Sequence, residues 1–363
     1  MRNRFHSLCP YFAMFPESFV RRHLVWSKPG DTVLDPFSGR GTTAFESLLG
    51  GRAALAGDTN PVAVCVSRAK ADPPTIASVR ERLEQLRLEF NDSERGPSGL
   101  QVDPFFQLCF AQETLEQVLF LRDQLQWKTR RTDTFIAALA LGCLHGESHR
   151  SKWVFSNRMP RTISTKPDYS VRWWKKQRCV PPRRDVFSIL RQVAEYRYVS
   201  PLPELRGRIA SCDARHLASR FKDSRASVSL VITSPPYLDT TNYREDQWLR
   251  LWFLGGASRP TRQKEADDRH RGAASYWMFL EEAWRGVAPL LKDGAHLVVR
   301  IGGRHIEKAS VEAELRLTLV RGLGASLRLR DRLTSRITNG QLQAFRPGAK
   351  GTEVEHDFHY QIQ

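Results

Sequence analysis

Apolar and polar positions follow a regular order at the start of the chain. Residues 32–34 form an apolar, β-branched run, a loop with two glycines follows, and the pattern of residues 44–49 favours a helix. A second strand is predicted over 53–57, and Pro61 suits the first position of a helix over 62–70. The order strand, loop, helix, strand, helix is typical of a doubly wound α/β domain.

The alternation of strands and helices stops near residue 71 and resumes near residue 206. Between these points, helices are predicted over 76–90, 105–127, 134–145 and 185–196. Further strands are predicted over 208–212, 228–233, 296–301, 326–330 and 357–362, with a helix over 276–291. We therefore predict an α/β fold, a doubly wound, Rossmann-like sheet of about seven strands with a large helical insertion.

Charge adds a candidate partner to this picture. The 363 residues are 41% hydrophobic and 26% charged, an ordinary globular composition, but Lys and Arg outnumber Asp and Glu 56 to 39. A formal charge of +17 favours association with a polyanion, and nucleic acid is the first candidate. The six cysteines form no Cys-x-x-Cys pair, so we expect no metal site and a reducing cytoplasm. No signal peptide or membrane span is predicted.

The glycine loop carries the first candidate chemistry. Gly39-x-Gly41-x-x-Ala44 matches the dinucleotide fingerprint, and Asp58 follows at the distance where an acidic residue holds ribose hydroxyls. Asp35 ends the strand before the loop and could accept a hydrogen bond from a ligand ammonium group. A structural turn, and for Asp58 a helix N-cap, are the alternatives. The loop lacks the lysine of a phosphate-binding P-loop, so a nucleoside ligand fits better than ATP.

Two further side chains are candidates for the same ligand. Phe37 could cover an adenosine or a methionine chain. Asp213 ends the strand predicted over 208–212, where it could recognise an adenine amino group or cap the next helix.

The strand predicted over 228–233 ends in Ser234, two prolines and Tyr237. Prolines end strand pairing and stiffen the turn, and a rigid turn with Tyr237 in the core is the plain interpretation. Rigidity also suits the alkylation of a base amino group, which is a poor nucleophile. Ser234 Oγ and the Pro235 carbonyl could accept its two hydrogens and orient its lone pair, while Tyr237 stacks on a flipped base.

On these residues the chain resembles the DNA amino-methyltransferases, especially the cytosine-N4 type, whose SPPY sequence is matched by residues 234–237. The DPFSGRGTT segment at 35–43 resembles their cofactor loop. FPESF at 15–19 resembles the segment placed over the methionine end of the cofactor, and the DxNP of 58–61 resembles their ribose-binding turn. The resemblance covers about residues 5–70 and 206–363.

The resemblance implies S-adenosyl-L-methionine as cofactor. The residues implied to bind it are Phe15, Pro16, Asp35, Pro36, Phe37, Gly39, Gly41, Thr42, Asp58, Asn60 and Asp213. The implied catalytic segment is Ser234, Pro235, Pro236 and Tyr237. Residues 1–70 would then be the cofactor-binding half of the methyltransferase domain, 71–205 an insertion for target recognition, and 206–363 the catalytic half.

Within the insertion, residues 150–184 are rich in basic and aromatic side chains and contain the single acid Asp168. This mixture suits phosphate contact and base stacking, although a charge run can also be a solvated face. The candidates for nucleic-acid binding are Arg150, Lys152, Trp153, Arg158, Arg161, Arg172, Trp173, Trp174, Lys175, Lys176 and Arg178, with Tyr243 and Arg244 after SPPY. Trp248, Leu251 and Trp252 favour the buried side of an amphipathic helix.

We therefore expect a site-specific DNA methyltransferase that acts on cytosine N4 in a duplex with a flipped target base. The resemblance leaves room for a companion restriction endonuclease. The alternatives are adenine N6 or RNA as the target, and a nucleic-acid-binding protein without catalysis. A nicotinamide-dependent oxidoreductase would explain the glycine loop and Asp58, but it leaves SPPY and the charge without a role.

Overall fold

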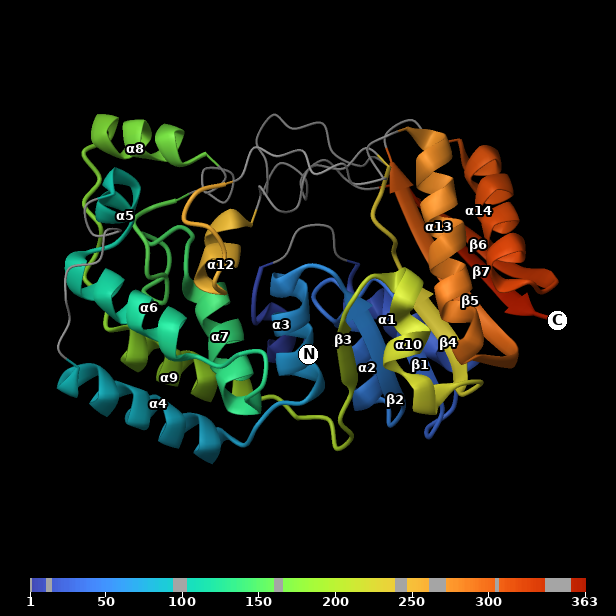
Figure 1. Ribbon diagram of the computed structural model, residues 1–363, viewed down its shortest axis with the longest axis horizontal. Helices are drawn as coiled ribbons and strands as arrows, with labels where there is room; N and C mark the ends of the chain where they lie inside the picture. Colours follow the sequence, from blue (N-terminus) through green and yellow to red (C-terminus); the bar gives the residue numbers. More distant parts are fainter. Residues whose placement is uncertain are drawn as a thin grey trace. The chain divides into compact units, whose positions relative to one another are not determined.

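Two sets of segments pack separately in the computed structural model (Figure 1). The structure describes residues 2–10, 15–93, 103–159, 166–238, 247–260, 272–303, 307–336 and 354–363. The helical unit is Met1–Pro10, Pro73–Leu202 and Asn242–Arg262, and the sheet unit is Tyr11–Asp72, Pro203–Thr241 and Gln263–Gln363. The helical unit thus contains most of the predicted insertion, together with segments from outside 71–205.

The sheet unit is built on seven strands. They are β1 (Thr32–Asp35), β2 (Ala53–Asp58), β3 (Arg208–Ser211), β4 (Val228–Thr233), β5 (Leu291–Gly303), β6 (Leu327–Arg336) and β7 (Val354–Ile362). Their order is β3-β2-β1-β4-β5-β7-β6, with β1 to β5 parallel and β7 antiparallel to both of its neighbours. This confirms the predicted fold class. The strand order reverses between β1 and β4, and in such sheets ligands bind beyond the carboxyl ends of the strands at the reversal.

Helices cover both faces of this sheet (Figure 1). They are α1 (Glu17–His23), α2 (Thr42–Leu49), α3 (Pro61–Ala71), α10 (Leu217–Arg220), α13 (Ala273–Val287) and α14 (Lys308–Leu323), with the 3-10 turns η2 (Leu24–Trp26), η4 (Ala214–His216), η5 (Lys222–Ser224) and η7 (Ala288–Leu290). Along β4, Val231 packs in the cluster formed with α13 and α14, whereas Leu230 and Ile232 pack in the cluster formed with α1. Successive strand residues point to opposite faces, so the central strands are apolar without a break.

The helical unit contains α4 (Ile76–Asp92), α5 (Pro104–Cys109), α6 (Gln112–Gln124), α7 (Arg131–Cys143), α8 (Pro167–Lys176), α9 (Val186–Tyr198), α12 (Trp248–Phe253) and the 3-10 turn η1 (Arg4–Ser7). Residues 135–141 of α7 are buried on every side, so α7 forms the centre of this unit. At Gly142 an added Cβ would lie 2.0 Å from the carbonyl oxygen of Leu8, so the glycine allows the N-terminal segment to pack directly on α7.

Some predicted elements differ from the structure. The helix predicted over 105–127 is two helices, because Phe110 and Ala111 adopt extended backbone between α5 and α6. The strand predicted over 326–330 extends to Arg336, and α14 was not predicted. In the part of the chain that the structure describes, the helices are too short or too polar to cross a membrane.

Candidate active site at the carboxyl edge of the sheet

A buried hydrogen bond joins the ends of β1 and β4. Thr233 Oγ1 donates to Asp35 Oδ1 at 2.7 Å, and the backbone N–H of Phe37 donates to the same oxygen at 3.1 Å. Asp35 and Thr233 are both buried, at 1% and 0% exposure. The first residue of the predicted loop and the last residue before SPPY are therefore in direct contact, although 198 positions separate them.

The second carboxylate oxygen of Asp35 is a buried acceptor without a hydrogen-bond partner among the described residues. Burial raises the pKa of Asp35 from 3.8 to about 6, against the lowering effect of the Thr233 hydrogen bond. A buried carboxylate with an unsatisfied oxygen is costly unless a cation or donor meets it. The arrangement fits the ammonium group of an amino-acid-like ligand.

Side chains of α3 hold the glycine loop in place. Gly39 and Gly41 have φ of 51° and 69°, in the left-handed region that favours glycine. A Cβ on Gly41 would lie 2.8 Å from Ser67 Oγ, and Ser67 Oγ donates to the Gly39 carbonyl at 3.0 Å. Lys70 Nζ, also on α3, donates to the Arg40 carbonyl at 2.7 Å. These contacts hold the loop close to the helix and keep it compact.

Asp58 connects the loops that follow β1 and β2. Its Oδ2 accepts the backbone N–H of Gly39 at 2.8 Å, and its Oδ1 accepts that of Asn60 at 2.8 Å. The N-cap of α3 is Asn60, whose Oδ1 accepts the N–H of Val62 at 2.9 Å. The N-cap alternative for Asp58 is thus wrong, and its role toward a ribose stays a prediction.

A neighbouring arginine binds both carboxylate oxygens of Asp213. Asp213 is the N-cap of η4, and its two oxygens accept Arg215 Nε at 3.0 Å and Nη2 at 2.9 Å. Burial tends to raise the pKa of Asp213, but the Arg215 hydrogen bonds outweigh burial and hold the pKa below its usual value. The capping interpretation is therefore observed, and adenine recognition by Asp213 stays a prediction.

The remaining cofactor candidates lie in or beside the same region of the chain. Phe37 is half-buried, with its ring 6.0 Å from that of Phe279 on α13. Phe15 is buried against Phe19 of α1, at 5.0 Å between rings. Three other candidates complete this set: the exposed Pro16 before α1, the buried Pro36, and the buried Thr42 at the start of α2. Their contacts with a cofactor stay predictions.

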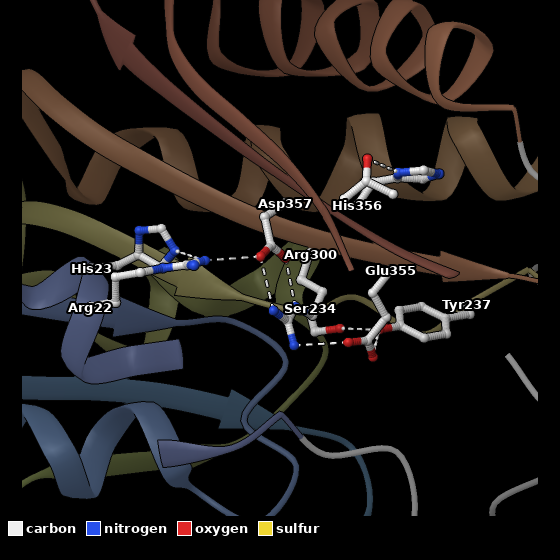
Figure 2. Close-up of polar contacts among 9 residues, drawn as sticks. Arg22, His23, Ser234, Tyr237, Arg300, Glu355, His356 and Asp357 are labelled. Atoms are coloured by element: carbon white, nitrogen blue, oxygen red, sulfur yellow. Dashed lines mark hydrogen bonds and ion pairs between the residues drawn. The ribbon is translucent and has the colours of Figure 1, made fainter. Parts of the chain in front are cut away.

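The SPPY segment directly follows Thr233, and its Ser234 and Tyr237 hydroxyl groups form a hydrogen-bonded chain with Glu355 (Figure 2). Ser234 is half-buried, Pro236 is half-buried, and Pro235 and Tyr237 are buried. Ser234 Oγ donates to Tyr237 Oη at 3.2 Å, and Tyr237 Oη donates to Glu355 Oε1 at 3.1 Å. Burial, and secondly the charge of Glu355, raise the pKa of Tyr237 well above its usual value, so its hydroxyl keeps its proton.

Charged side chains of β5 and β7 continue this chain of contacts, with Arg300 and Asp357 buried and Glu355 partly buried. Arg300 Nη1 donates to Glu355 Oε2 at 2.8 Å, and its Nε and Nη2 donate to Asp357 at 2.6 Å and 2.9 Å. Arg22 of α1 also donates to Asp357, at 3.2 Å (Figure 2). Arg300, Glu355, Asp357 and Arg22 were not among the residues predicted from the sequence. The signal was an arginine within an apolar strand and two acids at alternate positions of the last strand.

The basic and aromatic candidates divide by burial. Arg150, Lys152, Arg158, Arg172, Lys175, Lys176 and Arg178 are exposed, and Trp153 and Trp173 are half-buried. Trp174 is fully buried, packs 5.4 Å from the Phe105 ring and donates Nε1–H to the Arg158 carbonyl at 2.7 Å. Its ring offers no face to a base, so we leave Trp174 out of the proposed binding surface.

Other predictions from the same regions have mixed outcomes. Arg161, Tyr243 and Arg244 lie outside the described residues. On α12, Trp248 and Trp252 are buried as predicted, while Leu251 is only half-buried.

Comparison with known proteins gives one family match. Residues 2–67 match the family described as DNA methylase, a segment that holds the glycine loop and Asp58 but not SPPY. The match confirms the family resemblance for this segment and supports a methyltransferase, and the family uses S-adenosylmethionine as its methyl donor. No curated protein sequence matches the chain.

Similar solved structures are distant. TrmN from Thermus thermophilus is 13% identical to this chain, with a TM-score of 0.38. The alignment includes 99% of this chain and 53% of TrmN, so this chain spans about half the length of TrmN. The rRNA methyltransferase aviRa from Streptomyces viridochromogenes is 15% identical with a TM-score of 0.35, over 99% of this chain and 94% of that one. The fold is therefore assigned from the strand order alone.

Proposed function

We propose that this protein transfers a methyl group from S-adenosylmethionine to the exocyclic N4 amino group of cytosine in DNA. One observation carries the proposal. Thr233 holds the cofactor-side carboxylate of Asp35, and the next residue, Ser234, is the candidate acceptor for the target amine. Two adjacent residues thus connect a candidate ammonium site to a candidate amine site at the carboxyl edge of the sheet.

The residues present fit the cofactor. The Asp35 Oδ2, which has no hydrogen-bond partner among the described residues, would receive its ammonium group, and the Asp58 carboxylate would accept its ribose hydroxyls. The half-buried ring of Phe37 supplies an apolar surface beside the loop. When bound, S-adenosylmethionine supplies an electrophilic methyl group.

The chain's own residues then orient the amine. Ser234 Oγ and the carbonyl of Pro235 each accept a hydrogen bond from one amine hydrogen, which favours a pyramidal nitrogen with its lone pair directed away from both acceptors. Two consecutive prolines fix the position of these acceptors, so little ordering is needed during the reaction. The target base reaches this edge after it is flipped from the duplex, and Tyr237 stacks on it.

DNA as the substrate is supported by the family match of residues 2–67. The exposed basic side chains of α8 and of residues 150–158 would contact phosphates and contribute the salt-dependent part of the affinity. Serine before the prolines favours cytosine. Adenine N6 is the second candidate because the matched family is described only as DNA methylase.

The experiment is incubation with tritiated S-adenosylmethionine and duplex DNA, followed by digestion and chromatography of the nucleosides. Label in N4-methylcytosine supports the proposal, and label in N6-methyladenine moves it to adenine. Label only with ribosomal RNA would assign the protein to RNA, and DNA binding without any transfer would refute an enzyme.

The matched substitutions are Ser234→Ala and Ser229→Ala. Ser229 lies in β4, the strand that ends just before Ser234, and it is buried and donates to the Thr32 carbonyl at 3.2 Å, so it tests the loss of a strand hydroxyl remote from the SPPY segment. We expect Ser234→Ala to lower kcat about 100-fold at an unchanged dissociation constant for the cofactor. Ser229→Ala should leave kcat within about twofold.

A further inference from the structure

The hydroxyl groups of Ser234 and Tyr237 both donate their hydrogen bonds in the direction of Glu355. Arg300 donates to Glu355, Tyr237 donates to Glu355, and Ser234 donates to Tyr237 (Figure 2). A carboxylate can only accept hydrogen bonds, and a hydroxyl has a single proton to donate. Because Tyr237 gives its proton to Glu355, its oxygen is left to accept, and the proton of Ser234 turns toward it.

The direction matters at the far end of the chain. A Ser234 proton that points to Tyr237 cannot point to the target amine, so Ser234 presents only lone pairs there. A Ser234 proton turned toward the amine would instead occupy the nitrogen lone pair that must attack the methyl group. The orientation of one proton therefore separates a serine that assists the reaction from one that opposes it.

We infer that Glu355, held by Arg300, is a positioning residue that sets Ser234 as a pure hydrogen-bond acceptor through Tyr237. The inference rests on the proposed function. It assigns a role to an acid of β7, far from SPPY in sequence.

The surroundings of Glu355 keep it in place. Arg300 is 6% exposed and binds Glu355 and Asp357 at once, so its guanidinium is fixed by three hydrogen bonds. β5 and β7 pair directly, with Arg300 opposite Asp357 and Gly302 opposite Glu355. The guanidinium also stacks on the Phe19 ring at 4.0 Å. These paired contacts restrict the positions that the Glu355 carboxylate can take.

The test is Glu355→Gln, which keeps the shape and removes the charge. Arg300 still requires an acceptor, so the amide oxygen faces Arg300 and the amide nitrogen faces Tyr237. That nitrogen can only donate, so the direction of the whole chain reverses and the Ser234 proton turns toward the amine. We expect kcat to fall about 10-fold to 100-fold, while the dissociation constant for S-adenosylmethionine stays within about twofold.

Tyr237→Phe provides the decisive second variant. Alone, it leaves the Ser234 hydroxyl without direction and should lower kcat about 3-fold to 10-fold. Combined with Glu355→Gln, it removes the group through which the reversed chain acts. The kcat of the double variant should therefore equal that of Tyr237→Phe and be higher than that of Glu355→Gln alone. If the two substitutions acted independently, their fold-losses in kcat would instead multiply.

Glu46→Gln is the matched control for loss of the charge of a buried carboxylate that is paired with an arginine. Glu46 is 3% exposed and accepts two hydrogen bonds from Arg21, at 2.6 Å and 3.0 Å. Its kcat should stay within about twofold of wild type. All variants are compared in single-turnover transfer of the tritiated methyl group to duplex DNA, with thermal unfolding measured in parallel.

The outcomes separate this inference from the proposed function. The inference is supported if Tyr237→Phe is more active than Glu355→Gln and the double variant is as active as Tyr237→Phe. An active wild type with multiplicative losses, or with Glu355→Gln no slower than Glu46→Gln, overturns the inference alone. If Glu355→Gln does not fold, a Tyr237→Phe variant as active as wild type overturns it as well. A folded wild type that transfers no methyl group overturns both.

Discussion

Replacing Asp35 with asparagine should remove a pH-dependent loss of stability and weaken cofactor binding in the same step. The carboxylate is buried, one of its oxygens has no hydrogen-bond partner among the described residues, and its pKa is raised to about 6 by burial. In the unfolded chain the same group titrates near 3.8. The folded state therefore holds the proton more tightly, and stability falls as pH rises through this interval.

The magnitude follows from the two pKa values. The difference between about 6 and 3.8 corresponds to about 3 kcal/mol of lost stability above pH 6, at about 1.4 kcal/mol per pH unit. Roughly half of it, about 1.4 kcal/mol, develops between pH 5 and pH 7.5. Asn has no charge to desolvate, so this part of the pH dependence should be absent from Asp35→Asn.

Cofactor binding should change in the opposite direction. If the ionised carboxylate binds the ammonium group, about a tenth of the Asp35 side chains are competent at pH 5 and nearly all are at pH 7.5. The dissociation constant of wild type for S-adenosylmethionine should therefore be about 10-fold higher at pH 5. Asp35→Asn should bind weakly at both pH values, without this dependence.

Two measurements check the reasoning. Urea unfolding of both proteins without cofactor at pH 5 and pH 7.5 gives the change in their stability difference, and calorimetric titration gives cofactor affinity at the same pH values. A stability difference that does not change with pH would refute the buried, ionisable state of Asp35. Unchanged cofactor affinity in Asp35→Asn would refute its role toward the ammonium group.

Three further variants test other parts of the protein. Gly41→Ala combines a φ of 69° with an added Cβ 2.8 Å from a serine of α3. It should lower the free energy of unfolding by about 1 to 3 kcal/mol more than Gly30→Ala, where φ is 88° and no described atom lies within 4 Å of the added Cβ; urea unfolding compares the two variants. The double variant Lys175→Ala, Lys176→Ala should weaken DNA binding whatever the DNA sequence, and should reduce the slope of log affinity against log salt concentration by about 2. Filter binding at several salt concentrations measures this slope. An unchanged slope would exclude these two lysines of α8 from phosphate contact. Asp213→Ala should lower the free energy of unfolding by about 1 kcal/mol because the N-cap of η4 is lost. Cofactor affinity measured by calorimetry decides whether Asp213 also binds the adenine.

The sequence predicted those parts of the site whose signal is local. The loop at Gly39 and Gly41 and the double proline after Ser234 each restrict the backbone within a few residues, so their composition is sufficient. The pairing of Arg300 with Glu355 could not be predicted in the same way. It depends on β7 inserting antiparallel between β5 and β6, a long-range arrangement that no short pattern encodes.

Two other features of the structure could not be predicted from local patterns in the sequence. The apolar pattern continues from α5 into α6 across Phe110, which is itself buried, so periodicity gave no sign of the break. For the tryptophan pair of α8, adjacent residues on a helix point about 100° apart. Trp174 faces the core and Trp173 stays half-buried, and composition alone could not distinguish the two.

The strand order explains how the two halves of the site tolerate a long insertion between them. Pro73–Leu202 enters the chain between α3 and β3, and β3 is the edge strand beside β2. The pairing of β1 with β4, which brings Asp35 to Thr233, lies on the other side of β2 and needs no contribution from the inserted segment. Because the entropy of closing a chain grows only slowly with its length, a folded insertion at this edge adds little to the cost of forming that pair. Variation in the inserted segment should therefore leave the Asp35–Thr233 contact and the Ser234 chain as they are.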